Sequence, residues 1–113
     1  MIVSRSTVAH SIWGEGCDAW ELLASPGLSV KHERMPPGAR EVRHHHARAE
    51  QFFFVLSGAL TMEVEGETHR VAARHGIPVA PGVRHQAIND GEEAVEFLVI
   101  SVPPSAGDRI EES

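Results

Sequence analysis

Three consecutive histidines, His44, His45 and His46, are the residues of this chain whose types and spacing most clearly suggest chemistry. On a strand, His44 and His46 would share one face and His45 would point to the other, because alternate residues share a face. The two imidazoles would start about 6.6 Å apart and could tilt to reach one ion at the ~2.0–2.1 Å typical of Zn–N bonds. A solvated strand end explains the pair equally well, so a metal site needs further ligands.

The apolar segment that follows, residues 51–56, carries a polar residue at its head. Gln51, Phe53 and Val55 share one face of the expected strand. An unpaired buried amide costs on the order of 1–3 kcal/mol, so Gln51 should meet a metal, a ligand or a backbone group.

The other face of this strand is also apolar, since it carries Phe52, Phe54 and Leu56. A strand of this kind is buried on both sides. A monomer would expose an unusually large apolar patch there, so we expect a homodimer that buries this face.

The elements that must position these residues are short strands. Apolar runs recur between turn residues, with no long run of helical period, which predicts an all-β sandwich or barrel. The expected strands cover residues 28–34, 41–46, 51–56, 60–65, 68–72, 77–80, 84–89 and 94–102. We expect one domain over residues 1–113, with residues 1–20 as an N-terminal arm or strand and residues 103–113 as a loosely attached polar tail.

Composition narrows the class of protein. The 113 residues carry a net charge of -6, few aromatics and scattered basic residues, which argues against a nucleic-acid or membrane-surface partner. No apolar stretch approaches ~18 residues and no signal-peptide pattern is visible, so we expect a cytoplasmic protein. The single cysteine, Cys17, excludes an internal disulfide and a cysteine-based zinc site.

Two spaced motifs resemble those of the cupin superfamily. The first cupin motif reads Gly, five residues, His-x-His, three or four residues, Glu, six residues, Gly. This chain has Gly38, then His44-x-His46 after five residues, then Gln51 after four and Gly58 after six.

The second cupin motif reads Pro-x-Gly, two residues, His, three residues, Asn, and this chain has Ala80-Pro81-Gly82, His85 and Asn89 in that register. The resemblance covers most of the chain. It implies a small double-stranded β-helix, or jelly-roll barrel, that holds one divalent transition metal ion (Zn, Fe, Ni, Mn or Cu). The implied ligands are His44, His46, Gln51 and His85.

Gln51 stands where the cupin motif has a glutamate, and Glu50 lies one place earlier. If Glu50 were the ligand, the strand would need a slip or bulge before Gly58, because a one-residue shift exchanges the two faces. The spacing to Gly58 therefore favours Gln51. Three imidazoles and an amide leave the ion its full charge, which weakens binding and strengthens its action as a Lewis acid.

Residues beside the implied ligands are candidates for a pocket. Phe53, Val55 and Met62 are pocket walls or plain barrel core, and Ala87 shares the parity of His85. His32 shares the parity of two apolar neighbours on its strand, which predicts an inward side chain that contacts substrate, with a solvated strand end as the alternative.

The stretch "WGEGCDAW" from Trp13 to Trp20 has two glycines that could cradle an anion, but it lacks the strand and helix of a phosphate loop. A loop or small strand that packs its tryptophans on the barrel is the better interpretation.

The chain shows no serine or cysteine nucleophile arrangement and no carboxylate pair at glycosidase-like positions. One class that remains is a metal-dependent enzyme, dioxygenase- or isomerase-like, acting on a small organic substrate. The alternative is a non-catalytic cupin that binds or senses a small molecule, with or without metal. No general base other than the histidines is evident from the sequence.

Overall fold

The computed structural model describes residues 1–112, and the fold over this range is built from antiparallel β-strands. The strands are β1 (His10–Trp13), β2 (Cys17–Ser25), β3 (Leu28–Met35), β4 (His44–His46), β5 (Glu50–Ser57), β6 (Ala59–Val64), β7 (Glu67–Ala72), β8 (Gly76–Val79), β9 (His85–Ile88), β10 (Val95–Val102) and β11 (Arg109–Glu111).

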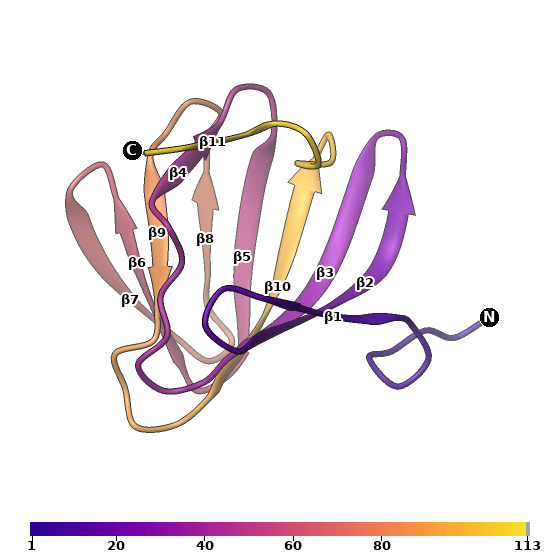
Figure 1. Ribbon diagram of the computed structural model, residues 1–113, viewed down its shortest axis with the longest axis horizontal. Coiled ribbons are helices and arrows are strands. Elements are labelled where there is room, and N and C mark those ends of the chain that lie inside the picture. The colour runs from indigo at the N-terminus through magenta and orange to yellow at the C-terminus, as the bar shows by residue number, and fades with distance from the viewer. Residues whose placement is uncertain (113) are drawn as a thin grey trace.

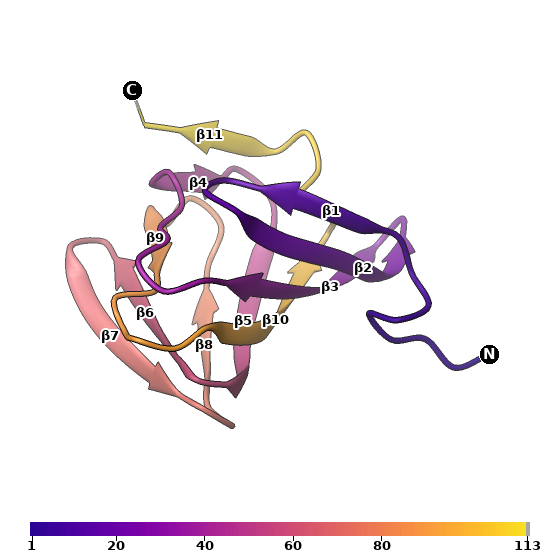
Figure 2. The same cartoon turned by 60° about the horizontal axis from the view of Figure 1, so that its bottom comes forward.

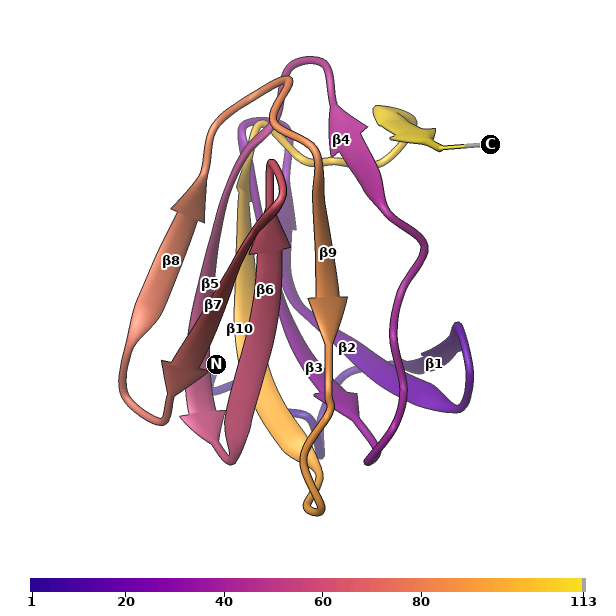
Figure 3. The same ribbon diagram turned by 90° about the vertical axis from the view of Figure 1, so that its left-hand side faces the viewer.

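The strands form two sheets that face each other (Figures 1 and 3). One sheet has the order β1-β2-β3-β10-β5-β8 and the other has the order β11-β4-β9-β6-β7. This is the double-stranded β-helix, or jelly-roll barrel, that the resemblance to the cupin superfamily implies, and it confirms the all-β class expected from the strand pattern. Within residues 1–112, no helix has the length and apolar character needed to cross a membrane.

The barrel core lies between the sheets and is filled by alternate residues of the long strands. Burial alternates along β5 and β10, as expected for strands with one face in the core. The largest fully buried apolar side chains are Phe97, Met35, Leu60, Met62, Val55 and Val95. In β5, Gln51, Phe53 and Val55 are buried, whereas Phe52 is 37% exposed.

The N-terminal region forms a β-hairpin. Trp13 pairs with Cys17 across the turn, and the two turn glycines have positive φ (53° at Gly14 and 74° at Gly16), a conformation that other residues adopt with strain. Trp13 packs against the core, as expected. The sequence did not predict the full length of β2, because the hydrophobic alternation there is interrupted by charged residues.

The expectation of a loosely attached C-terminal tail is wrong. Arg109 pairs with His46 and Glu111 pairs with His44, so β11 extends the smaller sheet beside β4. The segment before β11 crosses one end of the barrel (Figures 1 and 2). Asp108 is only 6% exposed, and its carboxylate accepts hydrogen bonds from the backbone N–H groups of residues 47–49. These bonds attach the C-terminal segment to the barrel, and the polar composition of the segment does not predict them.

Candidate metal centre

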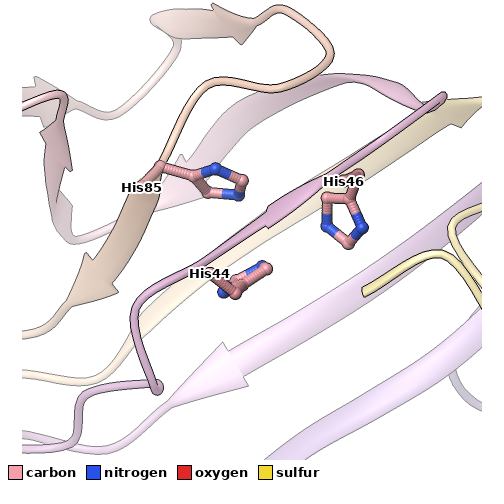
Figure 4. Close-up of side chains that lie close together, drawn as sticks. All are labelled: His44, His46 and His85. Carbon is pink, nitrogen blue, oxygen red and sulfur yellow. The ribbon is translucent and has the colours of Figure 1, made fainter. Parts of the chain in front are cut away.

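Three buried histidines from neighbouring strands converge at one end of the barrel (Figure 4). His44 and His46 point inward from β4, and His85 comes from β9, where it lies opposite His44. One nitrogen from each ring lies within 4.8 Å of the other two. All three residues are at most 5% exposed. The third member of the triplet, His45, points away from this cluster because it has the opposite parity.

Backbone carbonyl groups hold the three rings in one tautomer. Each Nδ1–H donates to a carbonyl oxygen: His44 to Val42 (2.8 Å), His46 to Asp108 (3.0 Å) and His85 to Val83 (2.9 Å). A carbonyl can only accept, so the proton lies on Nδ1 and Nε2 carries the free lone pair. The Nε2 atoms of His46 and His85 are buried and have no hydrogen-bond partner within residues 1–112.

The electrostatics of the cluster suit a cation. Burial lowers the pKa of His44 to about 3, and burial also lowers the pKa values of His46 and His85 below the ordinary range. The rings are therefore neutral at physiological pH. The three neutral imidazoles bring lone pairs close together, and their N–H groups point to backbone carbonyls, so none of them can donate a hydrogen bond to another. A transition metal ion is the usual partner of such a set.

Gln51 offers a fourth potential metal-binding atom, its side-chain oxygen, to the same space. Its Nε2 donates to the hydroxyl of Ser101 at 3.0 Å, and its Oε1 is buried without a partner within residues 1–112. Gln51 lines the same cavity as His44 and His46. Glu50, the alternative ligand, is exposed and has the opposite parity on β5. The residues present therefore fit a divalent transition metal bound by three imidazole nitrogens and one amide oxygen.

The cavity beside the cluster has a volume of about 260 Å³ and contains charged residues that sequence reasoning missed. Besides the ligand candidates, its walls include Phe53 and four ionisable side chains. Those four are Lys31, Glu33, Glu41 and Arg109.

The two carboxyl groups of the cavity have perturbed acidity. Burial raises the pKa of Glu33 to about 7, although the nearby Lys31 and Arg109 oppose the shift. Burial raises the pKa of Glu41 to about 8, against the backbone N–H of Ala87, which donates to Glu41 Oε1 at 2.9 Å. Glu33 is therefore a group that can gain or lose a proton near neutral pH.

Glu41 bridges the cluster and the cavity wall. One of its oxygens lies 4.0 Å from Nδ1 of His44 and 3.8 Å from a guanidinium nitrogen of Arg109. Its carbonyl group and carboxylate also accept hydrogen bonds from β9. Glu41 thus ties the segment before β4 to the strand that carries His85.

The expectation that His32 points inward is wrong. On β3 the residues that face the barrel interior are Ser29, Lys31, Glu33 and Met35, so the apolar Leu28 and Val30 lie on the outer face. His32 lies with them, and its Nε2 is 2.8 Å from Glu96 Oε1, which also accepts a hydrogen bond from Arg5 at 3.0 Å. Glu33 shares one face of β3 with Ser29 and Lys31, and this row of polar residues is the feature of the sequence that could have marked Glu33 as a candidate.

The remaining predicted pocket residues divide into two groups. Phe53 lines the cavity and its ring lies 5.9 Å from that of His85. Val55, Met62 and Ala87 are at most 1% exposed and belong to the hydrophobic core, which was the other interpretation of Val55 and Met62 but not of Ala87.

An antiparallel barrel of two sheets with histidines gathered at one end defines a small double-stranded β-helix protein. The chain belongs to the cupin family, because the family model described as "Cupin domain" matches residues 31–101. This match includes all four ligand candidates.

Individual relatives are more distant. The chain is 33% identical over 72 residues to the polyketide synthase CurC of Streptomyces cyaneus, covering 64% of this chain and 44% of that one. It thus spans less than half of CurC. The polyketide cyclase RemF from Streptomyces resistomycificus has a similar structure, with a TM-score of 0.87, 17% identity and coverage of 100% of this chain and 85% of that chain.

The fold is also similar to that of KdgF from Halomonas sp., with a TM-score of 0.79, 22% identity and coverage of 85% and 86% of the two chains. At these identities the structural likeness shows the fold alone.

Proposed function

We propose that the protein is a metal-dependent enzyme that moves a proton next to a carbonyl group of a small organic substrate. His44, His46, His85 and Gln51 would hold one divalent transition metal ion. The observation that carries the proposal is the placement of the Glu33 carboxyl group in the same cavity as His44, His46 and the unpartnered amide oxygen of Gln51.

A divalent ion with four neutral ligands keeps its full charge, and when bound it would supply Lewis-acid polarisation of a carbonyl oxygen. Glu33 takes the proton from the adjacent carbon and returns it elsewhere on the substrate. A pKa of about 7 suits both directions of this transfer at neutral pH. Lys31 and Arg109 line the same cavity and stabilise the negative charge that develops on substrate oxygen.

The names of two similar proteins support this chemistry. CurC is named a polyketide synthase and RemF a polyketide cyclase. Polyketide chains carry repeated ketone groups, and their cyclisation begins with loss of a proton beside a carbonyl. An isomerase-like proton shift uses the same first step.

Proton exchange in a simple diketone tests the proposal. The protein is loaded with Zn, Fe, Ni, Mn or Cu and incubated with 2,4-pentanedione in D₂O, while deuterium incorporation and oxygen uptake are followed together. We expect metal-dependent exchange that falls roughly 100-fold or more in Glu33→Gln, the loss typical of a missing general base. Glu50→Gln, a change of the same chemistry on the exposed side of β5, should leave the rate unchanged.

The other outcomes identify the alternatives. Oxygen uptake without metal-dependent exchange would indicate a dioxygenase-like oxidoreductase. Ligand binding without either reaction, across all five metals, would indicate a non-catalytic binding or sensing cupin.

A further inference from the structure

A second cavity of about 200 Å³ continues the space beside the histidine cluster. It shares four wall residues with the first cavity, namely Lys31, Glu33, Glu41 and Arg109. Its other walls are Ser11, Trp13 and Ala19, which come from the β1–β2 hairpin. Figure 2 shows this hairpin and β11 on the same side of the barrel end. The two cavities are therefore neighbouring compartments on either side of one group of charged residues.

The hairpin holds Trp13 at the edge of this space. The indole N–H donates to the backbone carbonyl of Asp18 at 3.3 Å, and the ring packs on the core while its residue remains only partly buried. Ala19, opposite Ser11 in the hairpin, presents only a methyl group to the cavity. A small residue beside an indole leaves room in the cavity next to one aromatic side chain.

The second tryptophan of the hairpin does not share this environment. The Trp20 ring lies 5.4 Å from that of His32 and 5.2 Å from the Arg5 guanidinium carbon, on the outer face of the larger sheet. Trp20 lines neither cavity, so it serves as the matched control for Trp13.

We propose that the second cavity is a subsite for the far part of an extended, planar substrate that carries oxygen substituents along one edge. This inference rests on the proposed function for the position of the reacting part, which lies beside the histidine cluster. The oxygen substituents meet Lys31, Glu33 and Arg109, whose charged and carboxyl groups lie between the two cavities. The planar apolar part lies against the indole of Trp13. A ligand with a single ring occupies the first cavity and does not reach Trp13.

Two probes with the same oxygen groups and different lengths test the subsite. Salicylate has one ring, and 3-hydroxy-2-naphthoate adds a second fused ring to the same hydroxy-acid unit. Affinities are measured by calorimetry on the full chain, once loaded with zinc and once without metal. We expect the naphthoate to bind the unmodified protein more tightly than salicylate does.

The variants separate the subsite from the rest of the cavity. Trp13→Leu should weaken naphthoate binding by about tenfold, the scale of a lost aromatic contact, and change salicylate binding less than twofold. Trp20→Leu should change neither. Ala19→Leu, which fills the second cavity and keeps the indole, should also weaken naphthoate selectively. It provides the test if Trp13→Leu does not fold, as judged by circular dichroism.

Three results would overturn the subsite. The variants could lose affinity equally for both probes, neither cavity variant could lose affinity for naphthoate, or the unmodified protein could fail to bind naphthoate at millimolar concentration. Its failure is distinguishable from failure of the proposed function. If the cavity variants lose naphthoate binding selectively but the protein shows no proton exchange, the subsite stands and the proposed function fails. If the protein shows proton exchange but the cavity variants have no effect on binding, the proposed function stands and the subsite fails.

Discussion

The main-chain carbonyl of Asp108 accepts the Nδ1–H of His46 at 3.0 Å across 62 residues of sequence. The carboxylate of the same residue accepts the backbone N–H groups of Ala47, Arg48 and Ala49 at 2.9–3.0 Å. Although burial opposes it, these three donors lower the pKa of Asp108 below its ordinary value. One residue of the C-terminal segment thus orients a candidate ligand and fixes the turn that follows it.

Replacing Asp108 should therefore weaken metal binding as well as folding. Asp108→Ala keeps the main-chain carbonyl that accepts from His46 and removes the carboxylate that fixes residues 47–49 beside it. Because the carbonyl is then held less firmly, we expect zinc affinity to fall roughly 10-fold and the Tm to fall as well. Chelator competition and thermal unfolding measure the two effects. Asp90→Ala, which removes the acceptor of the Thr61 hydroxyl away from the cluster, should lower the Tm and leave the affinity unchanged. Equal affinity loss in both variants would mean that Asp108 acts only through stability.

Removing one histidine of the cluster should abolish metal binding. His85→Ala leaves two imidazoles and an amide, which hold a divalent ion too weakly to survive purification. Elemental analysis should find about one ion per chain in the unmodified protein and close to none in the variant. His45→Ala, on the far face of β4, should keep its metal. A metal-free unmodified protein after reconstitution would contradict the metal centre.

The neutral amide at position 51 should set the affinity of the centre. Gln51→Glu places a carboxylate where the amide oxygen lies, and a negative ligand close to a divalent cation should tighten zinc binding by at least about tenfold. The same change lowers the net charge of the ion together with its ligands, so the ion polarises a carbonyl less and metal-dependent proton exchange should slow. Competition with a chromogenic chelator gives the affinity. An unchanged affinity would indicate that residue 51 does not bind the metal.

The raised pKa of Glu33 predicts a pH-dependent penalty on folding. The folded pKa is about 7 and the ordinary value is 4.5, so the folded state binds more protons between these values. The stability contributed by the protonated group is complete below about pH 4.5 and is lost as pH rises through 7. Glu33→Gln should thus gain on the order of 1–3 kcal/mol relative to the unmodified protein between pH 4.5 and 8.

Urea unfolding of both metal-free proteins across this range measures the difference. His44 works in the opposite direction, because its pKa is lowered to about 3 and its contribution is lost as pH falls below about 6.5. It is present in both proteins and cancels in the comparison. A constant difference in unfolding free energy across the range would contradict the raised pKa of Glu33.

The outer face of the larger sheet predicts self-association. Two cross-strand rows cover it: Val30, Ile100, Phe52 and Pro78 in one, and His32, Leu98 and Phe54 in the other. Leu56 extends the patch along β5. We propose a homodimer that buries this face, since its apolar side chains are only partly buried and Phe52 is 37% exposed. Sedimentation analysis at micromolar concentration should give a dimer mass, and Phe54→Glu should give a monomer. A monomeric unmodified protein would contradict the proposal.

Local periodicity was sufficient to predict half of the candidate centre. The spacing of His44 and His46 determines that they share a face, because strand alternation is a property of neighbouring residues. The preference for Gln51 over Glu50 followed from the spacing to Gly58 in the first motif that resembles those of the cupin superfamily. His85 was found through the second motif, which places it at a fixed distance after Pro81-Gly82.

Which face of a strand points into the barrel was decided only by the tertiary structure. On β3 the alternation is clear, yet the polar parity that carries Glu33 faces the cavity and the apolar parity that carries His32 faces outward. A cavity with charged walls and an outer face that is itself apolar reverse the usual rule that the apolar face points inward. The alternation along β3 therefore distinguishes two faces without showing which of them faces the cavity. Asp108 was missed for a related reason, because its partners lie about sixty residues away.

The sequence by itself thus determined the all-β class, through its periodicity, and the four ligand candidates, through the two motifs that resemble those of the cupin superfamily. The packing of the two sheets and of the C-terminal segment decided the rest. Pairing between distant strands places Glu33, Arg109 and Trp13 around one connected space, and the free energy of such pairing comes from contacts that no window of the sequence contains.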